Sequence, residues 1–287
     1  MTRIQKIFRK IGRRRKGSHK GSFGHVLVLA GSASYTGAPY LTSQAALLSG
    51  SGLVTLGVPA GIHPILAKKV VEVMARPFPE TDESSLSLKA EREITDFSEK
   101  VDVVAIGPGL SLNPQTQRLV RSLIAKIKKP FVIDADGIAA LAGHGGMLKK
   151  LKHPVVLTPH PGEFSRLTGR SVAAIQESRK KVAISFAKEY NVVLVLKGHG
   201  TVIAAPDGQT YVNKTGNPGM ASGGTGDVLT GMIASFIGQG LGPFEASILG
   251  VHVHGLAGDI AAKEKGELSL RATDLLHKIP DALKKLT

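Results

Sequence analysis

A glycine-rich segment near the carboxyl end of the chain has the residue types that bind phosphate. Residues 215–227 read Thr-Gly-Asn-Pro-Gly-Met-Ala-Ser-Gly-Gly-Thr-Gly-Asp and run directly into an apolar helical pattern. Gly223, Gly224, Thr225 and Gly226 leave the backbone open where that helix begins. Successive N–H groups there can point at one anion and gain from the helix dipole. The segment therefore predicts an anion hole.

Asp227 follows the predicted anion hole directly. A carboxylate beside a phosphate site opposes phosphate binding, so its presence suggests a catalytic role such as accepting a proton. The alternative is that Asp227 only complements the positive N-terminus of its helix. Three glycines within four residues favour the catalytic hypothesis, because a simple helix cap requires none of them.

A second candidate segment follows the apolar run at 192–196 and reads Lys197-Gly198-His199-Gly200-Thr201. The lysine ammonium could meet a phosphate and Thr201 could supply a hydroxyl, while the glycines allow close approach. The segment fits equally well a lysine whose stem covers apolar surface before a glycine turn. Its residues alone leave both interpretations open.

His160 lies at the end of another apolar run, between two prolines that restrict the local backbone. We favour a functional role for His160, whereas Glu163 is better explained as a first-turn acid of the next helix. Asp134 and Asp136 could serve a metal, but a turn carboxylate before a glycine is at least as good an explanation. His252 and His254 do not share a helix face, so a metal site there is not expected, and the metal ligands stay unknown.

The elements that must position these residues alternate short apolar runs with longer helical patterns. This alternation predicts an α/β fold with a mostly parallel central sheet and helices on both faces, as one domain over 25–287. Residues 192–213 instead predict antiparallel hairpins around Pro206-Asp207-Gly208, and the polar stretch 76–92 predicts a surface excursion. The expected strands are 25–30, 53–58, 70–75, 101–106, 131–134, 154–158, 192–197, 201–205 and 210–213, and the expected helices are 38–49, 114–128, 137–142, 162–168, 172–190, 225–238, 243–263 and 272–285.

Composition excludes several classes of protein. The 287 residues contain 34 glycines and no cysteine, so disulfides, zinc thiolates and cysteine nucleophiles are absent, which fits a reducing compartment. No uncharged apolar run is long enough for a membrane-spanning helix. Neither G-x-x-x-x-G-K-[ST] nor a G-x-G-x-x-G that opens a helix is present, which argues against P-loop enzymes and ordinary dinucleotide oxidoreductases.

Much of the formal charge of +15 lies in a basic N-terminal arm, residues 1–24, which has nine basic and no acidic side chains. The spacing of Ile4, Ile7, Phe8 and Ile11 predicts a short amphipathic helix. We favour a helix packed on the body with a solvated basic face over contact with nucleic acid or an acidic membrane. An organelle transit peptide is a further alternative. The arm is expected to be dispensable for chemistry.

Taken in order, these segments resemble the ADP/ATP-dependent NAD(P)H-hydrate dehydratases, a branch of the ribokinase-like superfamily. The resemblance covers about residues 18–285. Each motif is weak alone, but the ordered set is specific. The motifs are HKGSFGHVLVLAGS (19–32), TGAPYLTSQAALLSGSGLVTL (36–56), GPGL (107–110), DADG (134–137), LTPHPGEFSRL (157–167), LKGHGT (196–201) and NPGMASGGTGDVLTGMI (217–233).

The resemblance implies a carbon–oxygen lyase that repairs the S-epimer of NADH hydrate or NADPH hydrate. ADP or ATP, with Mg²⁺, would phosphorylate the added hydroxyl, and elimination of phosphate would restore the dihydronicotinamide. Asp227 matches the superfamily's catalytic base. Carried over by motif, the hydrate contacts are Ala38, Gly109, His160 and Asp227, and the nucleotide contacts are Lys197, Gly198, His199, Gly200, Thr201 and Gly226.

The sequence departs from the family pattern at two places. After Asp-Ala-Asp the family usually has Ala-Leu-Asn, where this chain has Gly137-Ile138-Ala139, and Ser111 stands where glycine is usual. The resemblance further implies a cytoplasmic homotetramer. About 24 residues precede the first expected strand, so the epimerase activity of larger relatives is expected in a separate chain. The alternatives are a ribokinase-like kinase of a small hydroxymethyl vitamin precursor and a noncatalytic nucleotide-binding protein.

Overall fold

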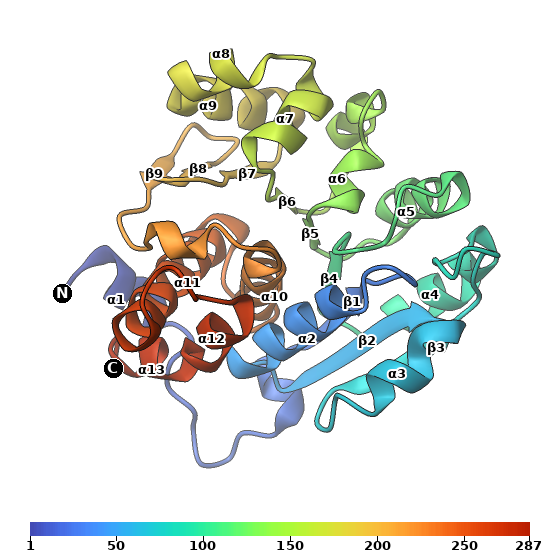
Figure 1. Ribbon diagram of the computed structural model, residues 1–287, viewed down its shortest axis with the longest axis horizontal. Helices are drawn as coiled ribbons and strands as arrows, with labels where there is room; N and C mark the ends of the chain where they lie inside the picture. Colours follow the sequence, from blue (N-terminus) through green and yellow to red (C-terminus); the bar gives the residue numbers. More distant parts are fainter.

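Nine strands form one sheet in the computed structural model, which describes residues 1–287 (Figure 1). The order is β3-β2-β1-β4-β5-β6-β7-β8-β9, with every pair from β3 to β7 parallel and the last two pairs antiparallel. The predicted mostly parallel sheet and its hairpins are therefore confirmed. The strands are β1 His25–Leu29, β2 Leu53–Pro59, β3 Met74–Phe78, β4 Val103–Ile106, β5 Phe131–Ile133, β6 Val155–Leu157, β7 Val193–Leu196, β8 Val202–Ala204 and β9 Thr210–Val212.

Helices cover both faces of the sheet, as predicted. Ser178 divides the expected helix 172–190 into two, and a second break near Lys278 divides the expected helix 272–285. None of the helices has the length and apolar character needed to cross a membrane. The helices are α1 Arg3–Phe8, α2 Gly37–Leu48, α3 His63–Ala67, α4 Glu91–Ser98, α5 Pro114–Lys126, α6 Asp136–Ala139, α7 Pro161–Thr168, α8 Val172–Glu177, α9 Arg179–Tyr190, α10 Thr225–Gly238, α11 Pro243–Lys265, α12 Ala272–His277 and α13 Ile279–Lys284.

The central strands are almost entirely apolar because each one contributes side chains to two hydrophobic cores. Successive side chains of a strand point to opposite faces of the sheet. In β1, Val26 and Val28 join the core under α10 and α11, whereas Leu27 and Leu29 join the core under α5 and α9. Burial on both faces accounts for the continuous apolar runs in the sequence.

Helix α10 is apolar on all sides because it packs against the sheet, α2 and α11 at once. Every residue from 228 to 237 is buried. The approach to α2 is as close as glycine permits, since a Cβ on Gly231 would lie 2.0 Å from the backbone oxygen of Thr42. This packing fixes the direction in which the N-terminus of α10 points.

The expected strand 70–75 is wrong, because the strand in this region is Met74–Phe78. Val70 and Val73 lie in the segment between α3 and β3, where their side chains join the core under α10 and α11 and take no part in strand pairing. The observed strand β3 is the edge of the sheet and pairs only with β2. An edge strand tolerates Pro77, whose nitrogen cannot donate to a neighbour.

The expected surface excursion over 76–92 is also wrong. This stretch completes β3, forms a bridge between Glu80 and Leu86, and starts α4 at Glu91. Phe78, Leu86 and Ala90 are almost completely buried in the core under α5. These single apolar residues are too widely spaced to form a periodic pattern, so their burial could not be predicted.

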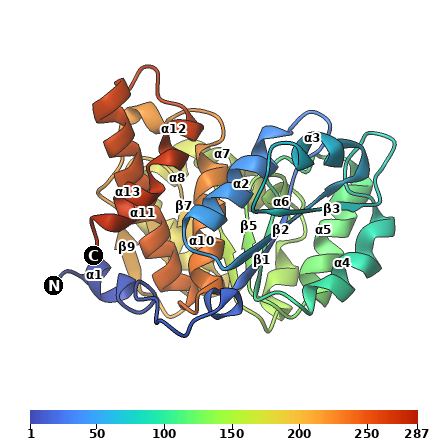
Figure 2. The ribbon, with the colours of Figure 1, turned by 90° about the horizontal axis from the view of Figure 1, so that it is seen from below.

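The basic arm starts with the predicted helix, which packs on α11 (Figure 2). A capping box between Thr2 and Gln5 starts the helix, and Ile4, Ile7 and Phe8 join the core. Farther along, the Arg14 guanidinium donates to the backbone oxygen of Gly50 at 2.7 Å. The favoured interpretation of a helix packed on the body is confirmed.

The buried side chain of Phe8 is expected to hold the basic arm against the rest of the protein. Phe8→Ala should lower the free energy of unfolding by up to about 3 kcal/mol, because it removes a buried aromatic ring. Arg13→Ser is the matched control, since Arg13 is exposed and such changes usually stay within about 0.5 kcal/mol. Denaturant unfolding measures both, and equal stabilities would contradict the packed arm.

Gly231 is expected to be irreplaceable for packing. Gly231→Ala should cost about 1–3 kcal/mol of stability, because the added methyl group meets backbone that cannot move aside. Gly146→Ala is the control, since nothing lies within 4 Å of a Cβ at that position. Melting temperatures compare the two, and an unchanged value for Gly231→Ala would show that α2 and α10 can separate freely.

Candidate active site

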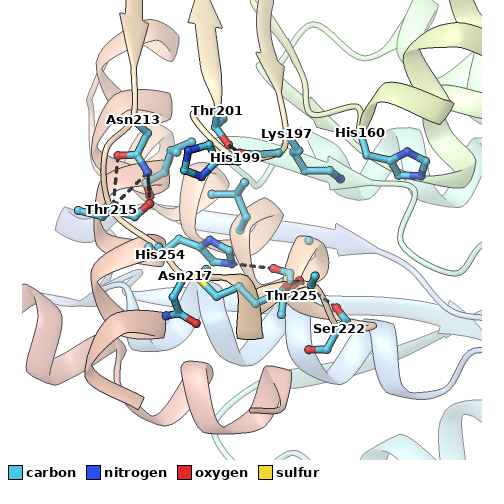
Figure 3. Close-up of a pocket in the computed structure, with 18 of the residues that line it drawn as sticks. His160, Lys197, His199, Thr201, Asn213, Thr215, Asn217, Ser222, Thr225 and His254 are labelled. Carbon is cyan, nitrogen blue, oxygen red and sulfur yellow. Dashed lines mark hydrogen bonds between the residues drawn. The ribbon is translucent and has the colours of Figure 1, made fainter. Parts of the chain in front are cut away.

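A cavity of about 750 Å³ opens where β5 and β7 end and α10 begins (Figure 3). His160, Lys197, His199 and Thr201 lie along one side of it, and the first turn of α10 lies along the other. Side chains from well-separated segments of the chain, between Asp134 and Gly255, are thus brought together. The predicted site residues that line it are His160, Lys197, Gly198, His199, Gly200, Thr201, Gly224, Thr225, Gly226 and Asp227.

Three predicted residues, Ala38, Gly109 and Gly223, do not line this cavity. Ala38 and Gly109 are nevertheless neighbours, because a Cβ on Gly109 would lie 3.2 Å from that of Ala38. Both belong to the α2 side of the molecule, and Leu41 of the same helix packs against Gly224. They form a separate patch beside the first turn of α10.

The predicted anion hole has the expected backbone form. Gly224 is the N-cap of α10 with φ of +90°, and a Cβ there would lie 2.5 Å from Leu41. The amides of the first turn have no carbonyl partner within the helix, and their residues, Thr225, Gly226 and Asp227, line the cavity. The N-terminus of a helix of this length also carries a partial positive charge. These features favour binding of a phosphate group.

Asp227 lies in the first turn of α10, yet no hydrogen bond engages its carboxylate. Burial raises its pKa to about 7, and Asp134 and Glu163 add to the increase, while Lys197 opposes it. A group with this pKa can change its protonation near neutral pH. The carboxylate is therefore free to accept a proton from a bound hydroxyl.

The Lys197 ammonium is held by acids at the cavity wall. Its Nζ lies 2.7 Å from Asp134 Oδ1 and 3.7 Å from Glu163 Oε2. Burial disfavours the charge, but these carboxylates outweigh it and raise the pKa of Lys197. The ammonium also lies 3.2 Å from where a Cβ of Gly226 would stand. The alternative of a lysine that merely covers apolar surface is therefore wrong.

Asp134 and Asp136 point to different partners. Asp134 binds Lys197 and also accepts a hydrogen bond from Thr230 Oγ1 at 2.8 Å, whereas Asp136 accepts one from the Ser111 amide at 2.9 Å. Ser111 has φ of +75°, which explains why glycine is usual there. No group of three His, Asp or Glu side chains gathers as a metal site in the chain.

His160 and Glu163 form a reciprocal cap on α7. Nδ1 of His160 accepts from the amides of Gly162 and Glu163, and Glu163 Oε2 accepts from the His160 amide at 2.7 Å. The structural role expected of Glu163 is confirmed. Its carboxylate also lines the cavity, and burial raises its pKa although Lys197 opposes the change.

Sequence reasoning missed Asn213 and His254 of α11 as residues of the site. They line the cavity together with Thr215, Asn217 and Met220 of the predicted segment 215–227. Nε2 of His254 lies 2.8 Å from the Thr225 oxygen, and burial lowers the His254 pKa to about 4, so the neutral ring donates to the first turn of α10. In the sequence, His252 and His254 suggest only a metal motif, and no spacing signal links His254 to Thr225, 29 positions earlier.

Comparison with known proteins agrees with this geometry. The family model described as NAD(P)H-hydrate dehydratase matches residues 26–281. The bifunctional NAD(P)H-hydrate repair enzyme Nnr of Moorella thermoacetica is 49% identical over 277 residues, which are 96% of this chain and 52% of that protein. The homologue from Thermofilum pendens is 45% identical over 95% of this chain and 52% of its own length.

The chain spans about half the length of the curated relatives it matches. Those relatives are named bifunctional, so they give no support to the expectation of a separate epimerase chain. A solved structure of similar length is the ADP/ATP-dependent NAD(P)H-hydrate dehydratase of Bacillus subtilis, co-crystallised with ATP/Mg²⁺, with 34% identity and a TM-score of 0.83 over 96% of this chain and 94% of that one.

A ribokinase-like superfamily protein of Enterococcus faecalis aligns with a TM-score of 0.84 and 29% identity over 99% of this chain and 95% of its own. The predicted ribokinase-like α/β fold is thereby confirmed. A family match over 26–281, a relative of similar length at 34% identity and the shared fold agree. This chain belongs to the NAD(P)H-hydrate dehydratase family.

Proposed function

We propose that this chain dehydrates the S-epimer of NADH hydrate or NADPH hydrate, with ADP or ATP as the phosphoryl donor. The observation that carries the proposal is the free carboxylate of Asp227, whose pKa is raised to about 7 beside the N-terminus of α10. Family membership supports the substrate class, and the co-crystallised ATP/Mg²⁺ of the Bacillus subtilis relative supports the donor.

The first step forms a phosphate ester. The added hydroxyl of the hydrate attacks the terminal phosphorus of the nucleotide, and its proton passes to Asp227. The bond from that phosphorus to the bridging oxygen breaks, and the shortened nucleotide leaves. Charge that builds on the transferred phosphoryl group is stabilised by the amides around Gly224 to Gly226 and by Lys197.

The second step removes the phosphate. The carbon–oxygen bond of the ester breaks, inorganic phosphate departs with the electron pair, and a proton leaves the neighbouring carbon. The new double bond restores the dihydronicotinamide. A cavity of about 750 Å³ whose walls include Lys197 and the first turn of α10 can retain the departing phosphate near positive groups.

The two ligands would occupy different parts of the site. The nucleotide is assigned to Lys197, Gly198, His199, Gly200, Thr201 and Gly226, all of which line the cavity. The hydrate is assigned to His160 and Asp227 in the cavity and to Ala38 and Gly109 beside it. This assignment has the hydrate reach from the cavity toward the neighbouring patch at Ala38 and Gly109.

Mg²⁺ is proposed to arrive with the nucleotide. Proteins commonly hold this ion through phosphates and water, with only one or two carboxylates. No three acids or histidines of the chain are arranged to hold a metal ion, and both oxygens of Asp134 already accept hydrogen bonds, so the side chains alone do not form a metal cage. When bound, the ion would neutralise phosphate charge.

The cytoplasmic location and the homotetramer stay predictions.

A single assay tests the proposed reaction. The purified chain is given each hydrate with ADP or with ATP, and dihydronicotinamide absorbance and free phosphate are measured together. Dehydration predicts that both rise in equal amounts. Phosphorylated hydrate without phosphate release would indicate a kinase, and binding without turnover would indicate a noncatalytic protein. Either outcome would overturn the proposal.

Asp227→Asn is expected to abolish most turnover. General-base assistance is typically worth about 10²–10⁴-fold, and the amide keeps the shape while losing the basicity. Nucleotide affinity, measured by calorimetry, should survive because the backbone donors remain. Asp281→Asn is the control, since Asp281 is a first-turn acid of α13 outside the cavity. Turnover within a few-fold of the parent would mean that Asp227 only complements its helix.

The same carboxylate predicts opposite pH trends for activity and stability. Because the Asp227 pKa is about 7, kcat/KM should rise with pH through that value as the base form appears. The folded protein keeps this proton at pH values where the unfolded chain has lost it, so the contribution of Asp227 to stability falls as pH rises from about 4 to 7. Asp227→Asn should therefore gain more thermal stability at pH 8 than at pH 5. An equal change at both pH values would contradict the raised pKa.

A further inference from the structure

Asp134 is the most deeply buried charged group of the site, with only 1% of its surface exposed. One oxygen accepts from Lys197 Nζ at 2.7 Å and the other from Thr230 Oγ1 at 2.8 Å. A buried carboxylate loses its hydration, and these two donors replace it. Such a buried ion pair contributes little net stability, so its main effect is on the arrangement of the site.

The two hydrogen bonds join three elements that are distant in the sequence. Asp134 follows β5, Lys197 follows β7, and Thr230 belongs to α10, one turn beyond Asp227. Thr230 is itself completely buried. The carboxylate therefore sets the position of the lysine relative to the helix that carries the anion hole and Asp227.

The backbone holds Asp134 in an unusual way. The next residue, Ala135, has φ of +48° and ψ of −119°, which residues with a Cβ rarely adopt. This turn directs Asp134 toward Lys197 and Asp136 toward Ser111. Strained backbone persists where surrounding structure holds it, and functional sites are where it gathers.

We propose that Asp134 is a positioning residue: by binding Lys197 and Thr230 together, it fixes the ammonium beside the first turn of α10, where it serves the nucleotide phosphates and faces Asp227. The proposal rests on the proposed function only for its effect on turnover. Without the Asp134 carboxylate, the ammonium would turn toward the remaining carboxylates, Glu163 and Asp227, and away from the nucleotide phosphates.

The charges around Asp227 give this role a measurable signature. The groups that face it are Asp134 and Asp136 from the β5–α6 region, Glu163 from α7 and Lys197 after β7. His254 of α11 is neutral at working pH. Removing the Asp134 charge takes away the strongest acidic neighbour, so the Asp227 pKa should fall.

The test uses Asp134→Asn, with Asp136→Asn as the control that removes a nearby charge without touching Lys197. For Asp134→Asn we expect ADP affinity to fall about tenfold or more and turnover about 10²-fold, as for a misplaced catalytic group. The Asp227 carboxyl, followed by carbon-13 NMR, should titrate at lower pH than in the parent, and by more than in Asp136→Asn. Unchanged ADP affinity and titration would overturn the proposal.

A mutant cycle separates positioning from a general loss of structure. In a Lys197→Met background, Asp134→Asn should have little further effect on ADP affinity, because the residue acts through the lysine. Thr230→Val should weaken ADP binding, and Thr230→Ser should restore it. Equal effects of Asp134→Asn with and without Lys197 would overturn the proposal.

Calorimetry and NMR require no hydrate, so they test Asp134 independently of the reaction. Coupling between Asp134 and Lys197 in a protein without dehydratase turnover would refute the proposed function and support the positioning role. Turnover in the parent protein without that coupling would support the proposed function and refute the positioning role. If Asp134→Asn does not fold, the two Thr230 variants carry the test, and absence of rescue by Thr230→Ser would overturn the proposal.

Discussion

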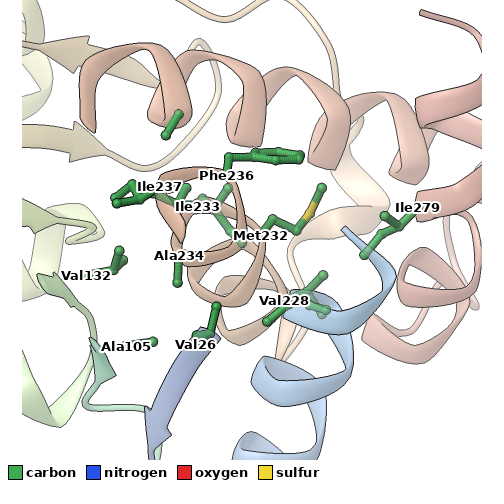
Figure 4. Packing of buried hydrophobic residues seen from close by; sticks show 14 of the residues in the cluster. Val26, Ala105, Val132, Val228, Met232, Ile233, Ala234, Phe236, Ile237 and Ile279 are labelled. Atoms are coloured by element: carbon green, nitrogen blue, oxygen red, sulfur yellow. The ribbon is translucent and has the colours of Figure 1, made fainter. Parts of the chain in front are cut away.

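The close approach of α10 to its neighbours is the constraint on which the site depends. Val228, Met232 and Phe236 and the residues between them fill the core between the sheet, α2 and α11 (Figure 4). Gly231 lets the helix lie directly against the α2 backbone. With its body held on three sides, the helix can present its first turn, bare of side chains at Gly224 and Gly226, to the ends of β5 and β7. Packing thus determines where an anion can bind.

The site then balances charges that repel one another. Asp134, Glu163 and Asp227 share a single ammonium, that of Lys197, in a partly buried wall. Burial and mutual repulsion keep Asp227 basic enough to accept a proton near neutral pH. The same repulsion would hinder an anionic nucleotide, so the positive end of α10 and the fixed lysine have to compensate. Basicity and phosphate binding therefore depend on one cluster of groups.

The fold was largely predictable because burial on both faces leaves a strong pattern. Runs such as 26–30 and 192–196 are apolar at every position, and both form strands. The failures occur where side chains are buried one at a time. Phe78 and Leu86 lie in mixed polar sequence, and Val70 and Val73 pack without pairing. A hydrophobic pattern shows the spacing of apolar residues. It does not show whether the backbone of a segment pairs with a strand or only lies near a core.

The site was predictable where the chemistry is local and unpredictable where it depends on the order of strands. Glycines before Asp227 indicate an anion hole because all the groups lie within one turn. The bond between Asp134 and Lys197 joins residues 63 positions apart, and it exists because β6 alone separates β5 from β7 in the sheet. In the sequence, Asp134 is adequately explained as a turn carboxylate and Lys197 as a lysine whose stem covers apolar surface. The carboxyl ends of parallel strands lie at one edge of the sheet. Charged residues that directly follow neighbouring strands are therefore expected to pair with one another before any local role is assigned to them.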